Sequence, residues 1–295
     1  MKLRFFISTV VILIFFTIQS VAQIDIITAK DFKSLLKKQE NLTIVDASKS
    51  KLYKKAHIKG AINLPYKKLN VKKEKSEIKG LLKSPEELAK LLGEKGISDK
   101  DFIVVYDEGS QKYSSRVYWV LKYLGAKDVK ILHKDNTTWR KARLPLTSSP
   151  TKTDAKTFEV NVNNDILATM DFVEKNLNND NVILIDARGK LEYAGIPDEK
   201  KNKYSKGHLP GAINIPYKKV LNEDKSFKSK EEMQKLADAN GFTPDKTYVV
   251  YCKTGVKAAV VFVALKNILE YPDVKLYDGA YLEWEHKGKT IVKEE

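Results

Sequence analysis

The most reactive side chain in the sequence is the thiol of Cys252, the only cysteine in the chain. It follows the apolar run 248–251, which is typical of a buried strand, and precedes the apolar, helix-forming stretch 258–265. Between them lies a short loop, Lys253-Thr254-Gly255-Val256-Lys257. A loop that leads from a strand into a helix presents free backbone N–H groups to an anion, and a glycine permits the tight turn that this requires.

The loop also carries two ammonium groups. Together with the helix N-terminus, Lys253 and Lys257 favour the thiolate, which is the nucleophilic form of cysteine. The alternative is an inert cysteine packed in a core. A lysine-rich loop with a glycine is an unfavourable place for such burial. We therefore predict that Cys252 is a nucleophile and that the loop 253–257 binds an anionic substrate.

The elements around this loop follow an alternating pattern. Short β-branched runs alternate with amphipathic helical stretches, which is typical of a parallel sheet covered by helices, and such sheets bind ligands beyond the carboxyl ends of their strands. The pattern occurs twice, with a segment rich in Pro, Ser and Thr between the two rounds. We expect an α/β protein of two domains, each a parallel β-sheet flanked by helices, at 23–147 and 156–295 with a linker at 148–155.

The two rounds are an internal duplication. Five segments of the first half recur in the same order in the second half: 27–32 and 167–172, 42–47 and 182–187, 57–66 and 208–217, 84–87 and 229–232, and 102–107 and 247–252. The segments 84–87 and 229–232 each begin with a serine followed three residues later by glutamate, which predicts a helix start. The second copy carries an insertion between Asp186 and His208. The duplication aligns Asp107 with Cys252, so the first copy has no thiol at this position.

The first 22 residues have the pattern of a signal peptide. Lys2 and Arg4 precede an apolar stretch, and Ser20-Val21-Ala22 offers small residues for cleavage. We expect a mature chain that begins near Gln23 and is exported, in the periplasm, without stable membrane insertion. The alternative is an uncleaved membrane anchor.

The formal net charge is +15, with lysine in excess. No basic run is interleaved with aromatic residues, and no nucleic-acid-binding motif is present, so we expect no nucleic-acid partner. The charge is best explained by a lysine-rich solvated surface with one local site for anions.

Three ordered motifs give the chain a resemblance to the rhodanese family. The loop Cys252-Lys253-Thr254-Gly255-Val256-Lys257-Ala258 resembles the family's active-site loop, and the segments 204–215 and 274–284 resemble its two flanking motifs. Tyr281 stands where Trp or Phe is usual, which we interpret as a packing change. With the duplication, the chain is similar to the tandem thiosulfate and 3-mercaptopyruvate sulfurtransferases, in which the second domain alone is chemically active.

The resemblance implies a two-step transfer of sulfur. The Cys252 thiolate takes the sulfane sulfur of a small anionic donor and holds it as a persulfide. Cyanide or a thiol, such as that of a thioredoxin-like protein, then removes this sulfur. The backbone N–H groups of the loop would stabilise the anionic sulfur, with no metal or organic cofactor. A basic residue at Lys253 is similar to thiosulfate enzymes, whereas a hydroxyl at Thr254 is similar to 3-mercaptopyruvate enzymes. We favour thiosulfate, because a dianion gains most from Lys253 and Lys257.

The resemblance also implies roles for three further residues. The Arg of Asp-Ala-Arg, here Arg188, binds the anionic end of the donor in similar enzymes; the alternative is a surface arginine paired with Glu192. His57 and Asp46 correspond to a pair that relays a proton beside the loop hydroxyl in similar 3-mercaptopyruvate enzymes. The alternative is that His57, like His208 in the second copy, holds a turn, and we favour this structural role.

Two other functions compete with sulfur transfer. Cysteine phosphatases that share this fold need an arginine six positions after the cysteine, but this chain has Ala258 there and Lys257 one position earlier. Phosphatase activity is therefore not expected. The other alternative is a sulfur carrier without turnover of its own, since a fold alone does not define a function.

Overall fold

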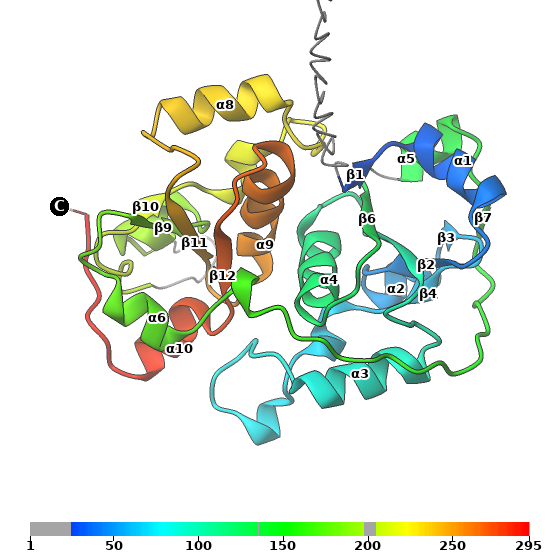
Figure 1. Cartoon of the computed structure of the whole chain (residues 1–295), viewed down its shortest axis with the longest axis horizontal. Coiled ribbons are helices and arrows are strands. Elements are labelled where there is room, and N and C mark those ends of the chain that lie inside the picture. Colours follow the sequence, from blue (N-terminus) through cyan, green and yellow to red (C-terminus); the bar gives the residue numbers. More distant parts are fainter. Residues whose placement is uncertain (1–24, 135, 198–204, 295) are drawn as a thin grey trace, which may run out of the picture.

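The computed structural model describes residues 25–134, 136–197 and 205–294. They form two α/β domains that lie side by side (Figure 1). The predicted signal peptide at 1–22 lies outside the described residues. Within the described ranges, no helix combines the length and apolar character needed to cross a membrane.

The first domain is built on a parallel sheet with the strand order β1-β6-β5-β2-β4. The strands are β1 (Ile26–Ile27), β2 (Leu42–Asp46), β4 (Ile62–Asn63), β5 (Phe102–Tyr106) and β6 (Val129–Leu132). The central strands are rich in β-branched residues and are buried on both faces, as parallel strands covered by helices require. In the central register Val45 lies opposite Val105.

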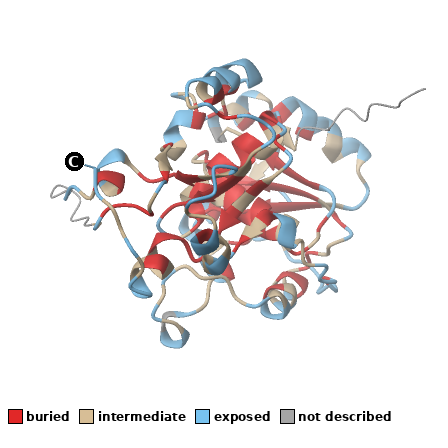
Figure 2. Ribbon diagram, turned by 60° about the vertical axis from the view of Figure 1, so that its left-hand side comes forward, coloured by how far each residue is buried: buried red, intermediate tan, exposed pale blue. Residues whose placement is uncertain are grey.

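The second domain repeats this arrangement with the order β10-β9-β11-β12-β8. Its strands are β8 (Leu167–Ala168), β9 (Val182–Asp186), β10 (Ile213–Asn214), β11 (Thr247–Tyr251) and β12 (Val274–Tyr277). Strands β5 and β11 occupy equivalent central places, as do β2 and β9. The predicted fold class, two parallel sheets flanked by helices, is confirmed. Figure 2 shows the buried strands in the interior and the exposed faces of the helices outside.

Helices cover both faces of each sheet. Those of the first domain are α1 (Ala29–Lys38), α2 (Ser50–Tyr53), α3 (Pro85–Glu94), α4 (Lys112–Tyr123) and α5 (Asn136–Lys141). Those of the second are α6 (Met170–Lys175), α7 (Lys190–Ala194), α8 (Lys230–Asp238), α9 (Val256–Val263) and α10 (Ala280–His286). The two predicted helix starts are confirmed, because Ser84 and Ser229 each form a capping box with the glutamate three residues later, at the starts of α3 and α8.

Short irregular elements complete the fold. They are the 3₁₀ turns at Tyr66–Leu69, Lys73–Lys75, Asn164–Ile166 and Tyr217–Val220, and a π-helical turn at Ala264–Ile268 that extends α9. Strand β3 (His57–Ile58) pairs antiparallel with β7 (Leu146–Thr147) and closes the first domain near its C-terminal end.

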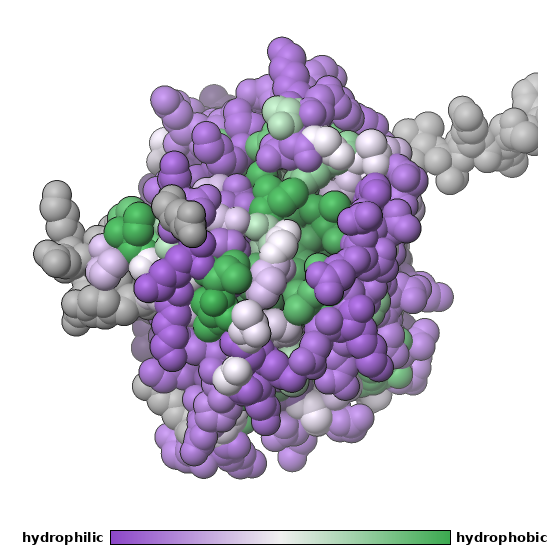
Figure 3. Space-filling view, turned by 90° about the vertical axis from the view of Figure 1, so that its left-hand side faces the viewer, coloured by the Kyte–Doolittle hydropathy of each residue, from purple (hydrophilic) through white to green (hydrophobic). Residues whose placement is uncertain are grey.

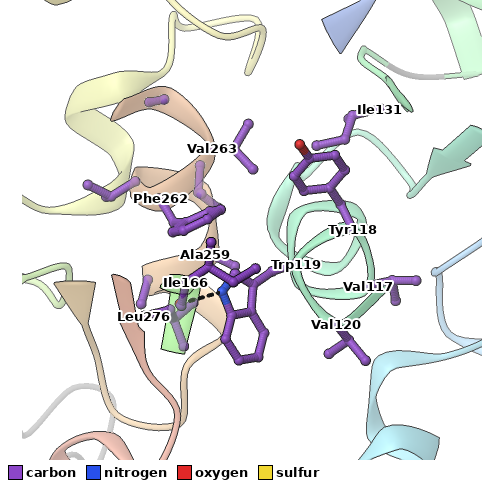
Figure 4. Close-up of a cluster of buried hydrophobic side chains, with 14 of the residues drawn as sticks. Val117, Tyr118, Trp119, Val120, Ile131, Ile166, Ala259, Phe262, Val263 and Leu276 are labelled. Carbon is purple, nitrogen blue, oxygen red and sulfur yellow. Dashed lines mark hydrogen bonds between the residues drawn. The ribbon is translucent and has the colours of Figure 1, made fainter. Parts of the chain in front are cut away.

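The two domains meet through α4 and α9, which pack against each other. Trp119 of α4 is fully buried and its Nε1 donates a hydrogen bond to the carbonyl of Ile166 at 3.2 Å. Figure 4 shows this indole beside Phe262 and Ala259 of α9. The buried side chains of the two helices belong to one continuous hydrophobic cluster. The interface therefore resembles a domain core, not a loose contact between modules.

The chain between the domains packs along the first domain. The N–H of Lys156 donates to the carbonyl of Gly93, and the N–H of Asn161 donates to that of Leu124. Phe158 is buried in the shared cluster. Residues 156–163, which we assigned to the second domain, are thus bonded to the first. The boundary at 156 followed from the end of the Pro-, Ser- and Thr-rich segment, and composition does not reveal the backbone hydrogen bonds of the residues after it. We call residues 150–163 the interdomain strap.

The surface agrees with the composition. Seen from the side of the second domain, hydrophilic residues cover most of the surface and surround a central area of hydrophobic residues (Figure 3). The exposed ion pairs of lysine with acidic residues include Lys90–Glu94, Lys100–Glu159 and Lys230–Glu270.

Candidate active site

Cys252 lies directly after β11, with 1% of its surface exposed. Gly255 caps the following helix with a left-handed backbone, φ +75°, which is the conformation that glycine adopts without strain. The start of the loop is held by the first turn of α10, because the N–H of Tyr281 donates to the carbonyl of Cys252 at 2.9 Å. The cysteine is therefore placed at a strand-to-helix corner, as predicted from the sequence.

The N–H groups of this loop are not used by the protein itself. Within the residues that the structure describes, no group accepts a hydrogen bond from the backbone N–H of residues 253–257. These donors follow Cys252 along the loop, and they include the first residues of α9. Such a set of N–H groups can stabilise a negative charge on sulfur.

The loop opens onto a pocket of about 230 Å³ that both domains line. The second domain provides Cys252, Lys253, Thr254, Val256 and Lys257, all of which were predicted, together with Glu192. The first domain provides Tyr66, Lys112 and Tyr113. These last three residues and Glu192 were missed as site residues. Only Tyr66 had a signal in the sequence, since the duplication aligns it with Tyr217.

The charges at this pocket are mostly positive. Lys253 is exposed, and the Nζ of Lys257 bonds to Oε2 of Glu192 at 2.8 Å, so one of the lysine charges is balanced. Lys112 adds a cation from the first domain and lies 5.4 Å from the centre of the Tyr113 ring. Three lysines against one glutamate favour a small anion in the pocket.

Two tyrosines of the first domain form the opposite wall. The rings of Tyr66 and Tyr113 stack with their centres 4.6 Å apart. Burial raises the pKa of Tyr66 above its ordinary value and raises the pKa of Tyr113 to about 12. Both hydroxyl groups are therefore protonated at neutral pH and can donate hydrogen bonds to an anionic ligand.

A larger groove of about 570 Å³ adjoins this pocket and shares Lys112 with it. Its lining comes from both domains: Ser110, Lys112, Tyr217, Lys218, Leu221, Asn222, Glu223 and Lys225. The Nζ of Lys112 lies 6.0 Å from the centre of the Tyr217 ring, at the junction of the two spaces. The groove gives a second molecule room to approach the cysteine pocket.

Arg188 is placed differently from either expectation. Its Nε donates to the two carboxylate oxygens of Asp186 at 3.0 and 2.9 Å. Its remaining N–H groups donate to Ser205 Oγ at 2.9 Å and to the carbonyl of Gly207 at 2.7 Å. Glu192, the alternative partner, bonds to Lys257 instead. The guanidinium is thus satisfied by its own domain and is not among the residues that line the pocket, so its role in donor binding stays a prediction.

The pairing of Arg188 with Asp186 has a physical cause. Both side chains are almost fully buried, and a buried carboxylate needs a compensating charge. Burial by itself lowers the pKa of Arg188, but the hydrogen bonds and charge of Asp186 outweigh it, so the pKa lies above its ordinary value. The Tyr281 ring covers the guanidinium at 4.0 Å. The tyrosine that departs from the family pattern is therefore a packing partner of this pair.

His57 and Asp46 do not form a proton relay in this structure. His57 is fully buried, its Nδ1 lies 2.7 Å from the Tyr53 carbonyl, and its Nε2 lies 3.1 Å from the Ser149 carbonyl. Asp46 accepts the N–H of Ser48 at 2.8 Å. Neither residue lines the pocket, and no hydrogen bond joins them among the described residues.

The second copy shows why the histidine is there. The His208 ring stacks on Tyr193 at 3.7 Å and contacts the Tyr193 carbonyl through Nδ1. The His57 ring stacks on Tyr53 in the same way, at 3.6 Å. Both histidines therefore hold the turn after a short helix, which is the structural role that we favoured.

The corresponding loop of the first domain is filled by its own side chain. One carboxylate oxygen of Asp107 accepts the N–H groups of Gly109 and Gln111 at 2.8 and 3.1 Å. The other accepts Ser110 Oγ and the N–H of Tyr113, both at 2.9 Å. The carboxylate occupies the N–H groups that an anion would otherwise bind.

Comparison with known proteins agrees with this geometry. A family model described as "Rhodanese-like domain" matches residues 28–142 and again residues 169–287. The chain is 35% identical, over 72% of its length and 78% of the relative, to the sulfur carrier protein TtuD of Thermus thermophilus. It is 30% identical, over 81% of its length and 80% of the relative, to thiosulfate sulfurtransferase of Bos taurus.

A solved structure is also similar. The crystal structure of SseA from Escherichia coli, described as a 3-mercaptopyruvate sulfotransferase, aligns with a TM-score of 0.78 at 26% identity. The alignment covers 88% of this chain and 99% of that one. The named relatives thus include thiosulfate, 3-mercaptopyruvate and carrier proteins, which share the handling of sulfur but differ in substrate.

Proposed function

We propose a sulfur-transfer function for this chain, which belongs to the rhodanese-like family through both of its domains. The names of its relatives support sulfurtransferase activity at this level. The finer proposal is a thiosulfate sulfurtransferase that carries the sulfur on Cys252. The observation that carries it is the thiol at the start of a loop whose N–H groups have no acceptor among the described protein groups.

The reaction follows from this placement. The Cys252 thiolate attacks the outer sulfur of thiosulfate, the S–S bond of thiosulfate breaks, and sulfite leaves with the bonding electron pair. The cysteine then holds a persulfide, whose negative charge lies among the N–H groups of residues 253–257. Cyanide or a thiolate attacks the outer sulfur in turn, which releases thiocyanate or a new persulfide and restores the thiolate.

Thiosulfate is favoured as donor by the charges that surround the pocket. Lys112, Lys253 and Lys257 are present against Glu192, and a dianion gains more from them than a monoanion does. The residues expected to assist 3-mercaptopyruvate offer less support, because His57 is held inside the first domain. The Thr254 side chain also packs against Gly80 of the first domain, because a Cβ built on that glycine would lie only 2.7 Å from the Thr254 Cβ.

The test compares the two donors on the same preparation. Purified protein is assayed for steady-state thiocyanate formation from cyanide with thiosulfate and, separately, with 3-mercaptopyruvate. Intact mass after each donor alone reports one added sulfur on the single cysteine. We expect a persulfide and a higher kcat/KM with thiosulfate. A higher kcat/KM with 3-mercaptopyruvate would reverse the donor assignment, and a persulfide that never turns over would identify a carrier.

We also propose that the mature protein acts outside the cytoplasm, in the periplasm. The support is the charged start, apolar stretch and small residues of segment 1–22. N-terminal sequencing of protein recovered from the periplasmic fraction should begin near Gln23. Recovery of the full-length chain in the membrane fraction would contradict the proposal.

A further inference from the structure

Arg116 is a first-domain residue whose side chain reaches into the second domain. It lies on α4, and 1% of its surface is exposed. Its Nη2 donates to Oδ1 of Asp278, the residue that follows β12. The Arg116 Cζ also lies 5.1 Å from the centre of the Trp119 ring. The guanidinium is therefore held in a single place at the domain interface.

The rest of the guanidinium faces the cysteine loop. Within the described residues, neither Nε nor Nη1 of Arg116 has a hydrogen-bond partner, although both atoms are buried. Nη1 lies 2.7 Å from the point where a Cβ on Gly255 would stand, and Cζ lies 3.1 Å from it. Buried donors without partners are rare, because they lose their hydrogen bonds to water without replacement. Their retention beside this loop requires an explanation.

Other contacts of the first domain reach the same loop. A Cβ built on Gly80 would meet the side chain of Thr254, and the N–H of Leu82 donates to Oδ2 of Asp278 at 3.1 Å. The inactive domain thus contacts the loop at Thr254 and Gly255 and anchors the residue that holds Arg116. Arg116 itself does not line the donor pocket. Its guanidinium instead contacts the loop at Gly255.

We propose that Arg116 is a positioning residue that the first domain supplies to the cysteine of the second. Its guanidinium supports the backbone of Gly255 from behind and places a permanent positive charge beside the loop that receives the sulfur. This charge stabilises the anionic thiol and persulfide, and the contact keeps the N–H groups of the loop directed inward. The inference rests on the proposed sulfur transfer, which it deepens.

The first experiment separates positioning from donor binding. Arg116→Met keeps most of the side-chain volume but removes the charge, whereas Arg116→Lys keeps the charge and can still reach Asp278. We expect Arg116→Met to lower kcat for thiosulfate by about tenfold or more with little change in the Michaelis constant. Arg116→Lys should recover part of that loss. Wild-type kcat in a folded Arg116→Met protein would overturn the proposal.

A second readout does not need any turnover. Iodoacetamide alkylates the single cysteine, and its rate at pH 7 reports the reactivity of the thiolate. We expect slower alkylation in Arg116→Met than in wild type, and an equal rate would contradict the role of the charge. If the wild type proves inactive with every donor, the proposed function fails, but the alkylation comparison still tests Arg116.

A third variant controls for the ion pair between the domains. Asp278→Asn weakens the pair with Arg116 but leaves the guanidinium beside Gly255. We expect it to retain more activity than Arg116→Met at matched melting temperature. If the two variants lose activity equally, domain docking alone explains the effect and the positioning role is wrong.

If Arg116→Met fails to fold, a double-mutant cycle of Gly255→Ala with Arg116→Lys replaces it. Purely additive effects of the two substitutions on kcat would contradict the proposed contact between Arg116 and Gly255.

Discussion

The loops that follow β5 and β11 occupy the same place in the two sheets, yet they differ in what fills them. In the first domain the carboxylate of Asp107 accepts hydrogen bonds from its own loop and from the start of α4. In the second domain Cys252 stands at that position, and the N–H groups of residues 253–257 have no acceptor among the described protein groups. One copy binds its own side-chain charge, whereas the other remains able to bind the charge of a substrate.

The backbones of the two loops differ as well. Two residues of the first loop have a positive φ, Gly109 at 97° and Gln111 at 59°, whereas in the second loop Gly255, φ +75°, caps the helix. A non-glycine residue is tolerated at the Gln111 position at some conformational cost. At the Gly255 position a side chain would also collide with Arg116. The loop of Cys252 is therefore restricted by its neighbour in the other domain.

The largest expected effect comes from replacing the thiol that distinguishes the two loops. Cys252→Ser should reduce thiocyanate formation by more than about 10³-fold, because a serine hydroxyl cannot hold a persulfide. The first domain cannot substitute, since Asp107 carries no sulfur. The melting temperature should stay close to that of wild type. If folded Cys252→Ser still formed thiocyanate above the uncatalysed rate, a residue other than Cys252 would carry the sulfur.

A second prediction concerns the residues beside β2 and β9. Asp186 is compensated by Arg188, whereas its counterpart Asp46 is followed by Ser48 at the equivalent position. Arg188→Ala should lower the free energy of unfolding by about 3–5 kcal/mol, because it leaves a buried carboxylate without a partner. Urea denaturation measures this loss.

The kinetics of the same variant decide between the two roles of Arg188. Any folded fraction should keep the Michaelis constant of wild type for thiosulfate. A stable Arg188→Ala protein with a raised Michaelis constant would support the donor-binding role for this arginine.

A third prediction tests whether Asp107 supports its own loop. Asp107→Ala should destabilise the protein by roughly 2–4 kcal/mol, since several buried N–H groups lose their acceptor. The matched change Gln111→Gly relieves the left-handed backbone and should alter stability by no more than about 1 kcal/mol. Chemical denaturation of the two variants gives both values. Equal destabilisation by the two variants would contradict the supporting role of the Asp107 carboxylate.

The smallest expected effect is the pH dependence that Asp46 causes. Burial raises the pKa of Asp46 above its ordinary value, so the folded protein holds the proton to a higher pH than the unfolded chain does. The contribution of Asp46 to stability is therefore complete at low pH and is lost as the pH rises through the folded pKa. Asp46→Asn should reduce this loss between acidic and neutral pH. Thermal melts over that range test it, and parallel curves for both proteins would contradict the assignment.

The sequence predicted those parts of the structure that local patterns encode. The duplication identified the equivalent strands, and the corner at Cys252 followed from an apolar strand, a glycine and an apolar helix. The pairing of Arg188 with Asp186 was not foreseen, because the spacing alone does not reveal that an aspartate at the same strand end bonds to the guanidinium.

The contributions of the first domain to the site could not be foreseen from the sequence. All four first-domain residues are distant from Cys252 along the chain. The packing of α4 against α9 brings Lys112, Tyr113 and Arg116 to the cysteine loop, and the 3₁₀ turn that contacts α4 brings Tyr66. A helix face that meets another domain has the same apolar periodicity as one that covers its own sheet. The sequence therefore predicted the loop side of the pocket, and of the first-domain side it offered only the alignment of Tyr66 with Tyr217.

The interdomain strap has a consequence for how the protein could be divided. Because residues 156–163 are bonded to the first domain while Trp119 and Phe262 share one core, neither half carries a complete surface of its own. A gene split near residue 164 should yield fragments that aggregate when produced singly but associate when produced together. We therefore expect the two duplicated halves to unfold together as one cooperative unit.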